Sequence, residues 1–80
     1  MTRVTLYTRA GCCLCDDAKQ VLAAARARAA FDFEEIDIDR HPEWFRLYNE
    51  EVPVIAIDGR KAFKYRLSMD EFLKKLAARA

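Results

Sequence analysis

The chain contains 80 residues, of which 52% are hydrophobic and 34% are charged. This length predicts a single domain over residues 1–80, and the composition excludes a disordered chain. No uncharged apolar run approaches the ~20 residues of a membrane span, so no membrane contact is expected. Fourteen basic residues against thirteen acidic ones give a formal net charge of +1, which argues against a nucleic-acid partner.

The first third of the chain is expected to fold as a strand followed by a helix. Residues 4–8 alternate in polarity and are rich in β-forming types, which predicts a strand. A helix is expected from residue 13 to about residue 29 because apolar side chains recur there at helical spacing. These side chains are Leu14, Ala18, Val21, Leu22 and Ala25.

The apolar residues of the next segment change phase within a few positions. Phe31 and Phe33 are at odd positions, whereas Ile36 and Ile38 are at even positions. One face of a strand cannot carry all four side chains, because the period of a strand is two residues. We therefore expect this strand to begin near Glu34, with the phenylalanines in its approach or at a bulge.

The second half of the chain predicts a helix, a hairpin and a final helix. Pro42 suits the first turn of a helix, and residues 52–57 form a continuously apolar run typical of a buried strand. Asp58 and Gly59 favour a tight hairpin turn into a charged strand. Ser68 then begins a capping box that predicts the last helix.

The resulting order is β-α-β-α-β-β-α. Strands that alternate with helices imply a parallel pair, and the hairpin adds an antiparallel pair. We therefore predict an α/β fold with a four-stranded mixed sheet, three helices and helices on both faces of the sheet.

All three cysteines of the chain fall within four positions, at Cys12, Cys13 and Cys15. Such a cluster cannot link distant segments, and the amino-terminal residues lack the apolar run of a signal peptide, so a reducing, cytoplasmic location is expected. Clustered thiols in that setting indicate redox chemistry or metal binding. Cys13 falls on the polar side of the predicted helix, where it is either incidental or a second nucleophile or metal ligand.

Cys12 and Cys15 form a Cys-x-x-Cys motif at a strand-to-helix junction. The thiolate is the reactive form of cysteine, and a helix N-terminus stabilises it through unpaired N–H groups and the helix dipole. Cys12 is therefore the expected nucleophile. Cys15 lies one turn later on the apolar side, so it is expected to be more buried and to attack a mixed disulfide on Cys12.

Three further residues are expected to contact the substrate. Arg9, just before the motif, could hold a thiolate or attract an anionic substrate. Pro53 stands at the first position of a buried strand, where a proline is tolerated. A cis peptide bond at this proline would free the backbone of Val52 to pair with an extended substrate.

The chain resembles the glutaredoxins of the thioredoxin superfamily, and the short bacterial glutaredoxin-like proteins in particular, in residues 4–9, Gly11, the Cys12/Cys15 pair, residues 35–39 and residues 52–54. The resemblance implies a thioredoxin-like fold, Cys12 as the attacking thiolate, Cys15 as the resolving thiol, and substrate contacts at Arg9, Val52 and the cis-proline Pro53. It also implies glutathione as a reductant. Arg66-Leu67 stands where glutaredoxins carry the Gly-Gly that admits glutathione, which predicts weak turnover with glutathione.

Two functions follow as alternatives. The first is a thiol–disulfide oxidoreductase that reduces disulfides of proteins or small molecules and is recycled by a thiol reductant or a reductase. It needs no cofactor, and we expect a monomer. The second is a soft-metal module for copper or zinc through Cys12, Cys13 and Cys15. Small metal carriers of that kind usually follow a β-α-β-β-α-β order, which differs from the order predicted here.

Overall fold

The computed structural model describes residues 2–79, with Arg79 described by its backbone alone. Its elements follow the predicted order: β1 (Arg3–Thr8), α1 (Cys13–Ala25), β2 (Asp32–Asp37), a short 3₁₀ helix η1 (Ile38–Arg40), α2 (Pro42–Tyr48), β3 (Val54–Ile57), β4 (Arg60–Lys64) and α3 (Met69–Arg79). Within these described residues, no helix is both long enough and apolar enough to span a bilayer.

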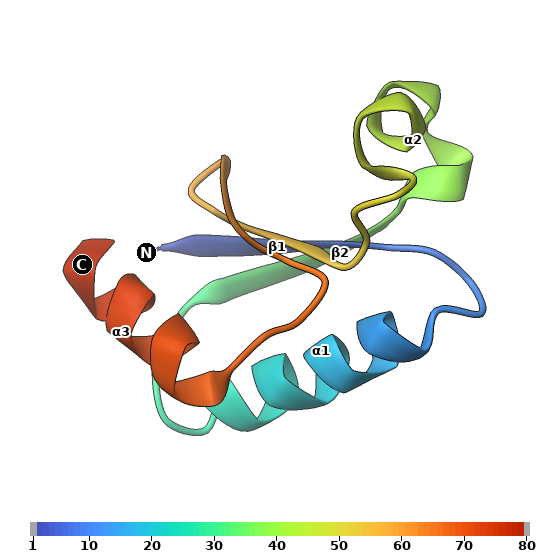
Figure 1. Cartoon of the computed structure of the whole chain (residues 1–80). Coiled ribbons are helices and arrows are strands. Elements are labelled where there is room, and N and C mark those ends of the chain that lie inside the picture. Colours follow the sequence, from blue (N-terminus) through green and yellow to red (C-terminus); the bar gives the residue numbers. More distant parts are fainter. Residues whose placement is uncertain (1, 80) are drawn as a thin grey trace.

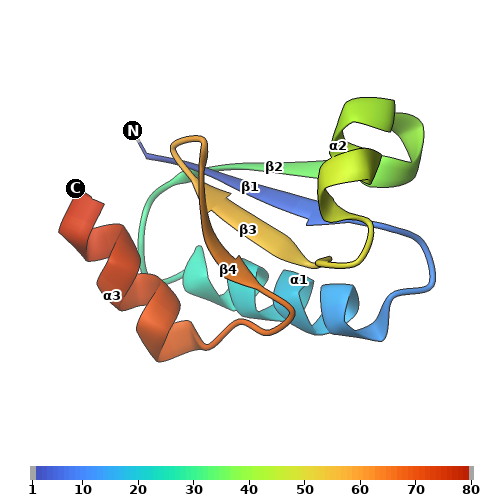
Figure 2. The ribbon, with the colours of Figure 1, turned by 45° about the horizontal axis from the view of Figure 1, so that its top comes forward.

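The four strands form one mixed sheet in the order β2-β1-β3-β4. β1 pairs parallel with β2 and antiparallel with β3, and β3 pairs antiparallel with β4. Helices α1 and α3 cover one face of this sheet, and α2 lies on the other face (Figures 1 and 2). The predicted sheet with helices on both faces is therefore confirmed.

Two apolar cores lie on the two faces of the sheet. The larger core joins β1 to α1 and α3 and includes the fully buried side chains of Leu6, Leu22 and Phe72. The smaller core lies under α2 and includes Tyr7 and Val54. Neighbouring residues of β1 thus point into different cores, as the period of two in a strand requires.

The structure corrects the predicted start of the second strand. β2 begins at Asp32 rather than near Glu34, and it pairs with β1 without a bulge. Phe33 packs against the larger core, whereas Ile36 packs against the smaller one. The change of phase indicates a break only for a strand with one buried face, and both faces of β2 are covered.

Local backbone geometry sets two other boundaries. α1 ends at Ala25 instead of near residue 29, and residues 26–29 continue as turns in which the Ala29 N–H donates to the Ala25 carbonyl at 2.9 Å. The predicted hairpin turn between β3 and β4 is confirmed. Asp58 and Gly59 both adopt positive φ angles, 52° and 84°, which is the backbone geometry that matches the twist of paired strands.

Candidate active site

Cys12 is the N-cap residue of α1. Its backbone is extended, with φ −95° and ψ 109°, and its sulfur accepts a hydrogen bond from the Cys15 N–H at 3.2 Å. The first N–H groups of a helix have no partners within the helix. One of them is therefore directed at the sulfur, and both this N–H and the helix dipole favour a negative charge there. Gly11, with φ 77°, supplies the left-handed turn before this cap.

Cys15 is 1% exposed and lies against the end of β1. Burial raises the pKa of its thiol above the ordinary value of 9.0, and a hydrogen bond between the side chains of Cys15 and Cys12 adds to the rise. Hydrogen bonds with the Thr8 side chain and the Arg9 backbone act in the opposite direction on the same pKa. The predicted burial of the second cysteine is confirmed, and its thiol is protonated at neutral pH.

The three cysteines do not converge. Cys12 is half-buried, Cys13 is exposed and Cys15 is buried, and all three are free thiols. In the part of the chain that the structure describes, no three His, Cys, Asp or Glu side chains are arranged to hold a metal ion. The structure thus gives no geometric support to a metal module built from Cys12, Cys13 and Cys15.

The Val52-Pro53 peptide bond is cis, as expected from the sequence. Pro53 is buried directly before β3, and the first residue of β3, Val54, pairs with Tyr7. The same antiparallel register places Thr8, the residue after Tyr7, opposite Pro53. The Thr8 side chain forms a hydrogen bond with the Cys15 thiol, so Pro53 lies near the cysteine pair. In both ribbon views the approach to β3 lies beside the first turn of α1 (Figures 1 and 2).

The backbone of Val52 is partly engaged within the protein. Its N–H donates to the carbonyl of Tyr48, the last residue of α2, at 3.2 Å. The carbonyl of the next residue, Pro53, accepts a bond from the Tyr65 N–H at 2.9 Å. The Val52 backbone was expected to pair with an extended substrate, and its N–H already has a partner within the protein.

The Arg9 side chain is directed at η1 and α2. Its guanidinium lies 3.2 Å from the Asp39 carboxylate, 3.5 Å from the Asn49 carbonyl oxygen and 5.3 Å from the centre of the Phe45 ring. These contacts attach α2 to the end of β1. Sequence reasoning placed Arg9 near the thiolate and missed Asp39 as its partner, although Asp39 falls in the segment already singled out for its family resemblance.

A groove opens beside the dithiol motif. It has a volume of about 170 Å³ and lies between the first turn of α1 and the segment that joins β4 to α3. Its lining residues are Leu14, Asp17, Tyr65, Arg66 and Leu67. Leu14 stands between the two cysteines of the motif, so the groove adjoins the Cys12/Cys15 pair. Sequence reasoning did not identify Tyr65, and no signal in its neighbours marks it.

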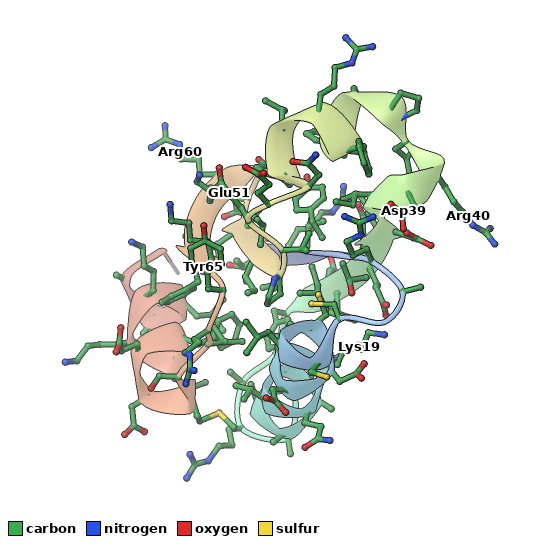
Figure 3. All side chains as sticks on the ribbon, turned by 45° about the vertical axis from the view of Figure 1, so that its right-hand side comes forward. Lys19, Asp39, Arg40, Glu51, Arg60 and Tyr65 are labelled. Carbon is green, nitrogen blue, oxygen red and sulfur yellow. The ribbon has the colours of Figure 1, made fainter. Side chains whose placement is uncertain are left out.

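An ion pair ties the segment before Pro53 to β4. The Lys61 ammonium lies 2.7 Å from the Glu51 carboxylate, and this contact holds the pKa of Glu51 below its usual range. Figure 3 shows Glu51 between the β3–β4 hairpin and α2. Lys61 of β4 thus holds the approach to Pro53, and the bond from the Tyr65 N–H to the Pro53 carbonyl holds the 65–67 connection to the same approach.

Residues 3–77 match the glutaredoxin-like domain family (DUF836). A glutaredoxin-like protein of Dictyostelium discoideum is 35% identical over an alignment that covers 85% of this chain and 68% of that protein. An uncharacterized protein of Mycobacterium tuberculosis is 33% identical, with 74% and 66% covered. The chain spans about two thirds of the length of these curated relatives.

Solved structures agree with this assignment. A structural-genomics target from X. campestris superposes with a TM-score of 0.78 at 34% identity and covers 94% of this chain and 96% of its own. The protein Ne2328 from Nitrosomonas europaea gives a TM-score of 0.80 at 29% identity, with 92% and 89% covered. The family match covers nearly the whole chain, and both the sheet order and the Cys12/Cys15 pair at the start of α1 agree with it. This chain therefore belongs to the glutaredoxin-like domain family.

Proposed function

We propose that this protein is a thiol–disulfide oxidoreductase in which Cys12 is the nucleophile and Cys15 the resolving thiol. The observation that carries the proposal is the 3.2 Å hydrogen bond from the Cys15 N–H to the Cys12 sulfur at the N-cap of α1. It supports the thiolate of Cys12 and keeps the second thiol within one helical turn. The half-buried Cys12 is open to a substrate, whereas the buried Cys15 is not.

The reaction has two exchange steps. The Cys12 thiolate attacks one sulfur of the substrate disulfide, so that a mixed disulfide forms and the other substrate sulfur leaves as a thiolate that takes a proton from solvent. The Cys15 thiol then gives up its proton and attacks the Cys12 sulfur, which releases the second substrate thiol and leaves a Cys12–Cys15 disulfide. The protein loses two electrons, and a small thiol or a disulfide reductase returns them.

The surroundings favour substrate contacts at Pro53 and Val52 and a structural role for Arg9 in place of the expected substrate contact. The segment between α2 and β3, which contains Val52 and Pro53, lies beside the first turn of α1 (Figures 1 and 2), and an extended substrate chain would pass the dithiol there. The Val52 N–H donates to Tyr48, so the hydrogen bond to a substrate falls to its carbonyl unless the Tyr48 contact is released. Arg9 acts by holding α2 in place through Asp39 and Phe45.

Single cysteine substitutions test the proposal. Cys12→Ser should abolish the reduction of a small aromatic disulfide, and Cys15→Ser should accumulate a mixed disulfide on Cys12 that mass spectrometry can locate. Cys13→Ser is the matched control, because it removes a thiol from the same turn and should keep the wild-type rate. An adduct found on Cys13 or Cys15, or full activity in Cys12→Ser, would refute the assignment.

A further inference from the structure

The charges of this chain are divided unevenly along the sequence. Residues 60–80 contain seven basic and two acidic residues, whereas residues 1–59 contain seven basic and eleven acidic residues. The formal charges of the two segments are therefore +5 and −4, and the overall value of +1 conceals the separation.

The fold turns this sequence pattern into two opposite sides of the molecule. β2 and β4 are the two outer strands of the sheet, and they carry opposite charge. Figure 3 shows Arg60 and Tyr65 on the β4 side, with Lys19 and Asp39 on the far side near β2. Five exposed cations on β4, on α3 and in the segment between them form what we call the basic surface: Arg60, Lys64, Arg66, Lys74 and Lys75.

The cations of the basic surface are not neutralised within the protein. Among residues 2–79, none of the five lies within ion-pair distance of a carboxylate, whereas Lys61, their neighbour on β4, is paired with Glu51. The carboxylates of β2, in contrast, are partly neutralised within the protein. Glu35 and Asp37 of β2 have Lys19 and Arg40 as partners. Five cations without an ion pair among the described residues thus lie together on this side. The other arginines that form no ion pair there, Arg3, Arg26, Arg28 and Arg46, are spread over β1, the end of α1 with the turns after it, and α2.

The basic surface reaches the reactive dithiol. Arg66 lines the groove of about 170 Å³ whose opposite wall is formed by Leu14 and Asp17 of α1. Leu14 separates the two cysteines of the motif, so the positive side begins next to Cys12 and Cys15. From there it continues along β4 through Lys64 to Arg60 at the hairpin.

We propose that the basic surface docks an acidic protein partner and presents the disulfide of that partner to Cys12, an inference that rests on the proposed function. Unpaired surface cations accelerate the encounter with an opposite charge and suppress the encounter with a like charge. The outer edge of β4 also exposes backbone groups with which an extended peptide can pair. Arg66 and Tyr65 would contact the residues next to the partner's disulfide.

Two other occupants fit less well. A nucleic acid would use only the cations and would gain nothing from the dithiol or from the open edge of β4. A second copy of the chain would have to place its acidic β2 on this surface, but two β2 carboxylates already have partners. Such a head-to-tail contact also does not close into a symmetric dimer.

The test compares two synthetic peptides that carry a cysteine in a mixed disulfide with thionitrobenzoate. One peptide has three glutamates around the cysteine and the other has three lysines. The released thionitrobenzoate gives the second-order rate constant. We expect the acidic peptide to react about fivefold faster or more at low ionic strength, with the ratio falling below about twofold in 0.5 M NaCl, since salt screens surface charges.

Charge reversal then locates the preference. The double variant Arg60→Glu/Lys64→Glu should lose the preference for the acidic peptide, whereas the control Arg28→Glu/Arg46→Glu should retain this preference. All four side chains are exposed, and both variants change the net charge by the same amount. Circular dichroism and the thermal midpoint verify that each variant is folded. Equal loss in both variants would show that only the net charge matters and would overturn the proposal.

A binding assay separates this proposal from the proposed function. A fluorescent acidic peptide with serine in place of cysteine should bind to the wild type and not to Arg60→Glu/Lys64→Glu. Binding without any disulfide reduction would refute the oxidoreductase but keep the surface. Equal reduction of both peptides would refute the surface but keep the oxidoreductase. Tighter binding of a single-stranded oligonucleotide of equal charge, or self-association that the double variant abolishes, would overturn the acidic protein partner.

Discussion

The backbone N–H of Cys15 points at the sulfur of Cys12 from a distance of 3.2 Å. The contact joins a half-buried sulfur that can meet a substrate to a residue whose own sulfur is buried. It arises because Cys12 stays outside the helix as its N-cap, while Cys15 lies inside the first turn. The two thiols therefore experience different surroundings although only two residues separate them.

The buried thiol predicts how the second exchange step depends on pH. Burial raises the pKa of Cys15 above 9.0, so the thiolate fraction should grow about tenfold per pH unit through pH 9.0 without a plateau. We expect the release of thionitrobenzoate from its adduct with Cys12, in a Cys13→Ser background, to follow this rise in stopped-flow absorbance. A plateau well below pH 9.0 would show that burial does not hold back the thiol.

The same shift has a consequence for stability. A thiol that is harder to ionise in the folded state than in the unfolded state stabilises the folded protein. This stabilisation is complete at pH values below the pKa of the thiol in the unfolded state. The free energy of unfolding should therefore decrease as pH rises from the ordinary value of 9.0 toward the raised one. Urea titrations of the reduced protein across this range measure the decrease. It should be smaller in Cys15→Ala, where Tyr7, whose pKa burial also raises, still contributes.

Truncation of Phe72 should cause the largest loss of stability among single truncations in α3. Its side chain is fully buried, and its ring lies 5.5 Å from that of Phe31 and 6.4 Å from that of Phe63. Phe72→Ala should lower the free energy of unfolding by about 3–5 kcal/mol. Leu47→Ala is the control, because Leu47 is 59% exposed and its truncation should cost less than about 0.5 kcal/mol. Similar midpoints in urea for both variants would contradict the assigned core.

Asp17 and Asp16 predict different effects on turnover with glutathione. Asp17 lines the groove beside Leu14, whereas Asp16 lines a separate pocket with Arg9 and Lys19. A surface charge several ångströms from an anionic substrate is worth at most about 1 kcal/mol. Asp17→Asn should thus raise kcat/KM for glutathione up to about fivefold, and Asp16→Asn should raise it by less. Equal increases would place glutathione outside this groove.

Arg9 is expected to act on the attachment of α2 rather than on the substrate. Arg9→Ala removes an ion pair and a ring contact, so it should lower the free energy of unfolding by about 1 kcal/mol. Asp39→Asn removes the ion pair alone and should have about half that effect. If Arg9 binds anionic substrates directly, KM for an acidic peptide disulfide should instead rise in Arg9→Ala and stay constant in Asp39→Asn.

Local sequence patterns were sufficient for the order of elements, the hairpin and the motif at the start of α1. Each depends on residues close in sequence, such as Asp58 with Gly59 or Cys12 with Cys15, whose backbone geometry is set by their neighbours. The start of β2 was misplaced because the burial of Phe33 and Ile36 on opposite faces depends on helices elsewhere in the chain.

The contacts of Arg9 and Val52 could not be predicted for a related reason. Arg9 meets Asp39 and Asn49, which lie 30 and 40 positions away, only after α2 packs across the sheet. Val52 gives its N–H to Tyr48 because the chain leaves α2 in a tight turn. A pattern of residue types contains neither the direction of a side chain nor the engagement of a backbone group.

Trp44, the single tryptophan of the chain, packs against the same core as Val52, which belongs to the segment proposed to bind the substrate. The Trp44 and Tyr48 rings are parallel to within 2°, with centroids 6.0 Å apart, and the Tyr48 carbonyl holds the Val52 N–H. Any ligand that draws Val52 away from this carbonyl also changes the surroundings of the indole. The native emission spectrum of Trp44 should therefore serve as a label-free optical sensor of occupancy at the Val52-Pro53 segment.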